Sequence, residues 1–225
     1  MRTSSVYLLV FGASLAVAMV PALFPALDIA VASYFLRPKP SFDPAGWLWV
    51  ELINEHTPTL FRALVLLCLP AWFVVRRLPK YRHWALPIAF FGLGVFMGPG
   101  LLVGAVKDAS LRARPFHVTE FGGIRQFTPA LEITNQCDDN CAFVSGHTSD
   151  GFFLATLMLI DRRRRWLWLV GGVVCGVIIG FARVSVGAHW LSDALWAFPI
   201  TLVGSWLVWL FLRRFHQGGE TLRDA

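Results

Sequence analysis

A series of long apolar runs limits how this chain can fold, because each run is suited to crossing a lipid bilayer as a helix. A spanning helix needs roughly 20 mostly apolar residues. Six segments come close to this length or exceed it: 5–27, 59–75, 84–106, 144–160, 166–184 and 192–212. Only 15% of the 225 residues are charged, whereas a typical soluble domain has about 25%. The sequence therefore predicts an all-α, integral membrane six-helix bundle that forms a single domain over residues 1–225.

The basic residues predict the orientation of this bundle, since segments rich in lysine and arginine stay on the cytoplasmic side of a membrane. They lie in alternate connections: Arg2, Arg76, Arg77, Lys80, Arg82, the four arginines at 162–165, Arg213 and Arg214. Both termini are then cytoplasmic, and 28–58, 107–143 and 185–191 face the other side. The arginines at 162–165 act either as this topology signal alone or also as a site for anionic lipid.

Two other interpretations of the composition are less favoured. A net charge of +6 is compatible with nucleic-acid binding, but the basic residues lie between apolar runs, so we expect lipid partners and no nucleic acid. Arg2 with the apolar run to Ala18 also resembles a cleavable signal peptide. Because the run continues beyond Ala18, a retained helix is favoured.

Glycines spaced four residues apart predict close helix packing, because they let helix backbones approach in lipid. They are Gly94, Gly98, Gly100 and Gly104 in one run, and Gly172, Gly176 and Gly180 in another. We expect packing within the chain, since these two runs end at Lys107 and Arg183. A homodimer face is the alternative that the sequence leaves open.

Three polar clusters lie on the predicted non-cytoplasmic face, where ionisable residues next to a bilayer are candidates for function. The first runs from Lys107 to Arg114 and Pro115, the second is Val144-Ser145-Gly146-His147, and the third is Ala182-Arg183 followed by His189 and Asp193. The patterns K-x6-R-P, S-G-H and R-x5-H-x3-D, in this order, resemble the type 2 phosphatidic acid phosphatase (PAP2) superfamily. The likeness covers about half of the chain, from the third to the sixth apolar run.

This resemblance implies a membrane-bound phosphatase that uses no metal and no other cofactor, with active-site loops at 107–147 and 183–193. Lys107, Arg114 and Arg183 would bind the phosphate, because phosphoryl transfer spreads negative charge over three oxygens. Arginine forks suit phosphate oxygens. Ser145 and Gly146 would add a hydroxyl and the free N–H groups of a helix N-terminus.

The two histidines and the aspartate supply the groups for covalent catalysis. Four residues separate His189 from Asp193, so Asp193 would accept a proton from one ring nitrogen and free the other to attack phosphorus. A phosphohistidine would form and be hydrolysed by water. His147 would protonate the leaving oxygen and then activate that water. Each residue alone has a structural explanation; the ordered set favours catalysis.

Cys137 and Cys141 stand in the loop before the second motif. In an oxidising compartment they would form a disulfide; a free pair or a metal site are the alternatives. This loop, from Gly122 through His147, resembles the bacterial lipid A phosphatase branch of the superfamily. Arg125 in it would either contact a second phosphate or a sugar of the substrate, or be a solvated charge.

Residues 37–58 carry aromatic and charged residues on a predicted amphipathic helix at the membrane interface, beside the substrate entrance. Glu51, Glu55 and His56 in it are a less favoured metal site. Arg62 is either a membrane anchor or a headgroup contact.

These features together predict a lipid phosphatase of the bacterial inner membrane whose active site faces the periplasm. The preferred substrate is a phosphate of lipid A. Undecaprenyl diphosphate and phosphatidylglycerol phosphate are alternative substrates, and a lipid phosphotransferase would use the same chemistry. The non-enzymatic alternative is a lipid-headgroup-binding or transport protein.

Overall fold

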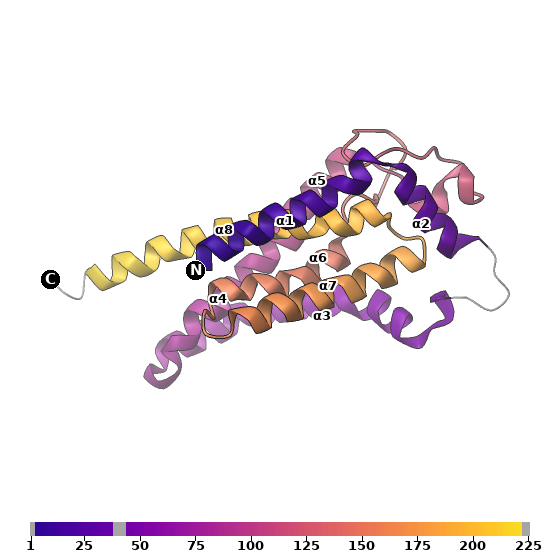
Figure 1. Ribbon diagram of the computed structural model, residues 1–225. Coiled ribbons are helices and arrows are strands. Elements are labelled where there is room, and N and C mark those ends of the chain that lie inside the picture. The colour runs from indigo at the N-terminus through magenta and orange to yellow at the C-terminus, as the bar shows by residue number, and fades with distance from the viewer. Residues whose placement is uncertain (1–2, 38–43, 222–225) are drawn as a thin grey trace.

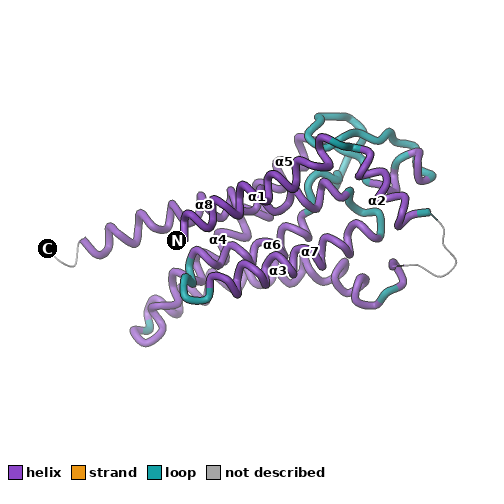
Figure 2. The backbone as a smooth tube through the Cα atoms, in the orientation of Figure 1, coloured by secondary structure: helices purple, strands orange, loops and turns teal. Residues whose placement is uncertain are grey.

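A computed structural model of the protein describes residues 3–37 and 44–221, so Arg2 and residues 38–43 of the expected interfacial segment lie outside it. Within these ranges the chain is helical and has no β-strand. The helices pack into one elongated bundle, and the long loop 111–145 covers one of its ends (Figures 1 and 2). The α-helices are α1 Thr3–Leu23, α2 Ala26–Leu36, α3 Leu48–Arg77, α4 Ala85–Val95, α5 Val103–Ser110, α6 Gly146–Thr156, α7 Arg165–Ser185 and α8 Leu191–Thr221.

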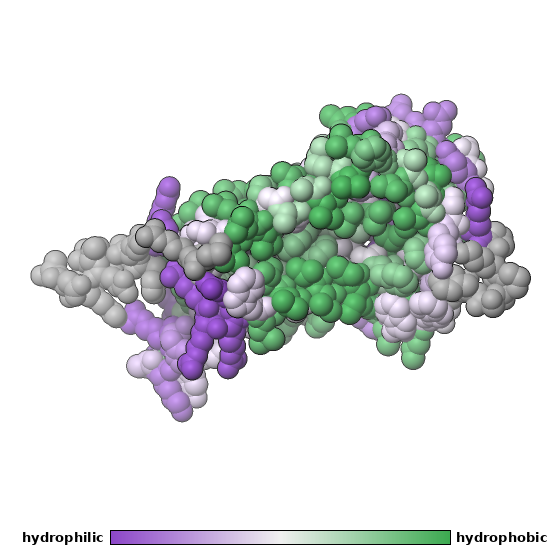
Figure 3. Space-filling view, in the orientation of Figure 1, coloured by the Kyte–Doolittle hydropathy of each residue, from purple (hydrophilic) through white to green (hydrophobic). Residues whose placement is uncertain are grey.

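Five helical stretches of the described chain are long and apolar enough to cross a membrane: Thr3–Leu23, Leu48–Arg77, Pro79–His117, Arg165–Ser185 and Leu191–Arg214. They account for five of the six predicted runs. The sixth, 144–160, corresponds to α6 and the short helix η6, Leu157–Leu159, and α6 has only 11 residues. On the face shown in Figure 3, hydrophobic side chains cover the middle of the bundle, and hydrophilic ones gather towards its two ends.

Prolines explain why several helix boundaries differ from those predicted. The first run is divided at Pro25, which lies between the end of α1 and the start of α2. The third run continues through Pro99 by widening into the π-helical segment η3, Phe96–Leu102, a common response to a residue that has no N–H. By contrast, α3 continues through Pro58 without a break, so the predicted interfacial helix and second span are a single helix.

Glycines bring two pairs of helices into contact. A Cβ added at Gly172 of α7 would lie 2.0 Å from the backbone nitrogen of Ala155 in α6. One at Gly204 of α8 would lie 2.6 Å from the Cα of Gly98 in η3. Packing within the chain is therefore confirmed at Gly172 and Gly98, whereas Gly204 was not among the predicted glycines. It is not seen at Gly104, where an added Cβ would meet nothing within 4 Å.

The bundle brings several helix ends together beneath the loop 111–145. The C-terminal ends of α5 and α7 and the N-terminal end of α8 lie at this end of the molecule (Figure 1). The N-terminal end of α1 and the C-terminal end of α8 lie at the opposite end (Figure 1). The three polar clusters found in the sequence are therefore all carried to one end of the bundle.

Candidate active site

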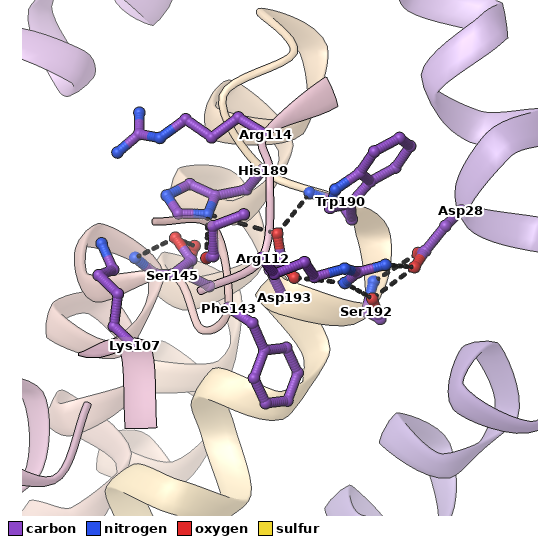
Figure 4. Close-up of polar contacts among 12 residues, drawn as sticks. Asp28, Lys107, Arg112, Arg114, Phe143, Ser145, His189, Trp190, Ser192 and Asp193 are labelled. Carbon is purple, nitrogen blue, oxygen red and sulfur yellow. Dashed lines mark hydrogen bonds and ion pairs between the residues drawn. The ribbon is translucent and has the colours of Figure 1, made fainter. Parts of the chain in front are cut away.

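The side chains of the three polar clusters converge at this end. Figure 4 shows Lys107, Arg114, Ser145 and His189 on one side of Asp193, while a second group of polar residues lies on its other side. The residues that the sequence singled out thus come from the end of α5, the start of α6, the end of α7 and the segment before α8.

His189 is 1% exposed, and a backbone carbonyl fixes its ring. Nδ1 lies 2.8 Å from the carbonyl oxygen of Ala142. Because a carbonyl oxygen only accepts hydrogen bonds, Nδ1 carries the proton and the neutral ring leaves Nε2 unprotonated. Burial and the cations Arg183, Lys107 and Arg114 lower the pKa of His189 well below its ordinary value of 6.5. The ring is therefore neutral at pH 7, with one nitrogen available as a nucleophile.

Asp193 does not form the predicted hydrogen bond to His189. Its Oδ2 lies 3.6 Å from His189 Nδ1 and accepts the backbone N–H of Trp190 at 2.8 Å. This is half of a capping box, in which an acidic residue in the first helical turn reaches back to the residue before the helix. The Ala142 carbonyl therefore orients the ring, and the Asp193 carboxylate lies beside it at an ion-pair distance.

Lys107 and Arg114 both contact Asn140. The Lys107 Nζ lies 3.4 Å from Asn140 Oδ1, and Arg114 Nε donates to the Asn140 carbonyl oxygen at 2.9 Å. Asn140 belongs to the short loop closed by a disulfide between Cys137 and Cys141. Of the alternatives for these cysteines, the structure has the disulfide, and the loop that it closes contacts two of the three cations.

Arg183 and His147 both contact Asn54, a residue of α3. Arg183 Nη1 donates to Asn54 Oδ1 at 2.9 Å, and His147 Nε2 lies 3.1 Å from the Asn54 carbonyl oxygen. Arg183 is only 9% exposed, and its Nε has no hydrogen-bond partner in the part of the chain that the structure describes. A buried donor without a partner is costly, and an anion bound beside Arg183 would satisfy it.

Ser145 caps α6. Its Oγ accepts the backbone N–H of Thr148 at 3.4 Å and the Thr148 hydroxyl at 2.7 Å. The serine is fully buried, whereas Gly146 and His147 after it are partly exposed. Gly146 and His147 therefore form the accessible part of this helix start, and a helix N-terminus is favourable for binding an anion.

Three residues behind Asp193 were not predicted as site residues: Arg112, Asp28 and Ser192. Arg112 Nη1 lies 2.6 Å from Asp193 Oδ1, and its Nη2 lies 2.8 Å from Asp28 Oδ2. Asp28 also accepts the backbone N–H of Ser192 at 2.9 Å, so α2 caps the start of α8. One signal was available in the sequence: an aspartate in an apolar stretch such as Asp28 needs a partner.

The remaining predictions concern surface residues. Arg125 forms an ion pair with Asp138 and lines a surface pocket of the loop 111–145. Glu55 and His56 lie 4.0 Å apart on the exposed side of α3. Among the side chains that the structure describes, no three His, Cys, Asp or Glu residues are arranged to hold a metal ion, so Glu51 does not complete a site with them.

Comparison with known proteins gives similarities of both sequence and fold. A sequence model of the PAP2 superfamily matches residues 87–217. The lipid A 4'-phosphatase of Francisella tularensis subsp. novicida is 33% identical over 202 residues, which cover 85% of this chain and 89% of that protein. The lipid A 1-phosphatase of Rhizobium etli is 35% identical over 134 residues, covering 56% of this chain and 52% of that protein.

A solved structure shares the fold. It is the crystal structure of the first transmembrane PAP2 type phosphatidylglycerolphosphate phosphatase from Bacillus subtilis, which aligns with a TM-score of 0.52 at 18% sequence identity. The alignment covers 95% of this chain and 98% of that one, so the similarity of fold includes the N-terminal helices that precede residue 87.

Proposed function

We propose that this chain, which belongs to the PAP2 superfamily and is a membrane lipid phosphatase of that type, removes a phosphate group from lipid A. Support comes from the similarity to lipid A phosphatases, one of which aligns over most of both chains. Undecaprenyl diphosphate and phosphatidylglycerol phosphate are the alternative substrates. The pocket beside Arg125 is where a second phosphate or a sugar of a large headgroup would bind.

The observation that carries the mechanism is the hydrogen bond from His189 Nδ1 to the Ala142 carbonyl, since it leaves Nε2 free in a ring surrounded by cations. Nε2 attacks phosphorus, a nitrogen–phosphorus bond forms, and the bond from phosphorus to the lipid oxygen breaks. His147 enters this step as an imidazolium, with a proton on both ring nitrogens, and donates one of them to that leaving oxygen. Water then gives a proton to His147 and attacks the phosphohistidine, which releases phosphate and restores His189.

The three cations and the start of α6 bind the phosphate during both steps. Lys107, Arg114 and Arg183 balance the charge on the equatorial oxygens, which is the main requirement of phosphoryl transfer. The unpartnered Nε of Arg183 and the N–H groups at the start of α6 offer further donors. Asp193 stabilises the positive charge that develops on His189. No step in this scheme needs a metal ion.

The proposed topology has six membrane crossings, with α6 as the fourth, and both termini in the cytoplasm. Two features support it: the N-terminal end of α1 and the C-terminal end of α8 lie at the same end of the bundle, opposite the candidate site (Figure 1), and the Cys137–Cys141 bridge suits an oxidising compartment. The site would then face the periplasm from the inner membrane of a bacterium. A homodimer remains a prediction.

Phosphate release by the purified protein tests this proposal. Lipid A, undecaprenyl diphosphate and phosphatidylglycerol phosphate are supplied separately, with a metal chelator present. We expect release from lipid A, its loss in His189→Asn, and a labelled phosphoenzyme when the substrate phosphate is radioactive. Full turnover by His189→Asn would overturn the mechanism, and release only in the presence of an acceptor lipid would indicate a phosphotransferase.

A further inference from the structure

Pro58 leaves the carbonyl of Asn54 without its usual partner inside α3. In an α-helix the carbonyl of residue i accepts the N–H of residue i+4, and Pro58 is the i+4 residue of Asn54 but has no N–H. His147 Nε2 lies 3.1 Å from this carbonyl oxygen. Because a carbonyl only accepts, Nε2 carries a proton in this contact and is not the nitrogen that exchanges one with the substrate. Because of Pro58, a backbone carbonyl in the interior of α3 is available to accept a hydrogen bond from a histidine of another helix.

The side chain of Asn54 makes a second hydrogen bond to a residue of the candidate site. Its Oδ1 accepts from Arg183 Nη1 at 2.9 Å. The two contacts join residues 93 and 129 positions apart in the sequence, so neither follows from helix geometry alone. One residue of α3 thus binds a histidine of α6 through its backbone and an arginine of α7 through its side chain.

We infer that Asn54, together with Pro58, is a positioning residue that sets the orientation of both His147 and Arg183. The inference rests on the proposed phosphohistidine mechanism. With Nε2 bound to the Asn54 carbonyl, Nδ1 is the nitrogen of His147 that exchanges a proton with the lipid oxygen and then with water. With Nη1 bound to Asn54 Oδ1, Arg183 keeps its unpartnered Nε for the phosphate.

The two positioning residues lie in the N-terminal half of the chain, outside the motifs. Asn54 and Pro58 both precede residues 87–217, the segment matched by the family model. The motifs supply the reacting groups, whereas α3 supplies the contacts that orient two of them. α3 therefore contributes to catalysis although it carries none of the three motifs.

Two substitutions separate the two contacts. Pro58→Ala provides an N–H that competes with His147 for the Asn54 carbonyl, but it leaves the Asn54 side chain intact. Asn54→Ala removes the acceptor for Arg183 but keeps both the carbonyl and Pro58. The first should impair proton donation to the leaving group, and the second should impair phosphate binding.

Leaving-group dependence tests the first contact. The value of kcat/KM is measured for an alkyl phosphate, whose alkoxide needs a proton, and for p-nitrophenyl phosphate, whose leaving group does not. General acid catalysis contributes about 10²–10⁴-fold, so we expect Pro58→Ala to lower kcat/KM about 10-fold or more for the alkyl phosphate and less than about 2-fold for p-nitrophenyl phosphate. Pro70→Ala is the matched control, because Pro70 is an exposed proline of the same helix. Equal losses on both substrates, or the same pattern in Pro70→Ala, would overturn this part of the inference.

Inhibition by inorganic phosphate tests the second contact. We expect Asn54→Ala to raise the inhibition constant of phosphate several-fold without changing the leaving-group dependence, and Asn54→Gln, which keeps a neutral acceptor oxygen, to raise it less. Unchanged inhibition in Asn54→Ala would refute the role of the side chain. If Pro58→Ala does not purify as a single species, the inference is accepted or rejected on this measurement. Activity of His189→Asn on either substrate would instead count against the proposed mechanism, so the two failures are distinguishable.

Discussion

The guanidinium of Arg112 lies 2.6 Å from the carboxylate of Asp193, and neither side chain is more than 1% exposed. Asp28 binds the other side of the same guanidinium at 2.8 Å (Figure 4). Two carboxylates therefore share one buried cation directly behind His189. In the proposed mechanism, these carboxylates lie where negative charge favours the positive imidazole that would form on His189.

Replacing Arg112 should destabilise the protein. Arg112→Met would leave two buried carboxylates without their cation, and removing one partner of a buried ion pair costs about 3–5 kcal/mol. Thermal unfolding of the detergent-solubilised protein measures the effect. Arg125→Met is the matched control, because Arg125 pairs with the exposed Asp138 and such surface pairs contribute about 0–1 kcal/mol. Equal melting temperatures for the two variants would contradict this role of Arg112.

Breaking the disulfide should weaken phosphate binding. The loop between Cys137 and Cys141 holds Asn140, which contacts both Lys107 and Arg114. A Cys137→Ser variant frees this loop, so we expect KM to rise several-fold with a smaller change in kcat. Steady-state kinetics measures both constants. Cys68→Ser, which removes a free cysteine, should leave them unchanged, and an unaltered KM in Cys137→Ser would count against a supporting role for the loop.

An alanine at Gly172 should disrupt the packing of α7 on α6. The added methyl group would lie 2.0 Å from a backbone nitrogen, which cannot move aside as a side chain can. Overpacking of this kind costs about 1–3 kcal/mol or more, and thermal unfolding measures it. At Gly104 an added methyl group has open space, so Gly104→Ala should retain or raise the melting temperature. The prediction fails if both variants unfold alike.

Acidification should destabilise the wild-type protein more than His189→Asn. The pKa of His189 is lowered in the folded state by burial and neighbouring cations. As the pH falls through about 6.5, the ordinary value for histidine, the unfolded chain takes up a proton that the folded protein does not. The resulting loss is at most about 1.4 kcal/mol per pH unit from one group. Melting temperatures from about pH 7.5 to pH 5 test this, and parallel curves would disprove it.

Features that depend on the local sequence, such as helices and motif spacing, could be predicted, whereas contacts between helices far apart in the sequence could not. The apolar runs predicted helices because length and hydropathy are local properties, and the motifs placed His189 and Arg183 in one cluster by their order. Hydropathy did not predict that α3 begins at Leu48, because a change from amphipathic to apolar sequence does not end a helix. The spacing of His189 and Asp193 predicted their ion pair, but it could not predict that Nδ1 binds the Ala142 carbonyl, because Ala142 is 47 residues away and Asp193 also caps Trp190.

The partners of Arg112 and Asn54 illustrate what sequence patterns leave out. Arg112 and Asp28 are separated by 84 residues, and Asn54 and Arg183 by 129. Helical periodicity tells which side of a helix is apolar, but not which other helix faces it. A single asparagine or aspartate on such a side has no local signature that distinguishes its partner.

Because α2 supplies Asp28 to the first turn of α8, the N-terminal part of the chain is bound into the same structure as the motifs. A shortened protein that kept only residues 87–217 would expose Arg112 and leave His147 and Arg183 without Asn54. Transplanting the motif-bearing half onto another N-terminal half would therefore give an inactive chimaera unless the recipient offered equivalent acceptors at both places.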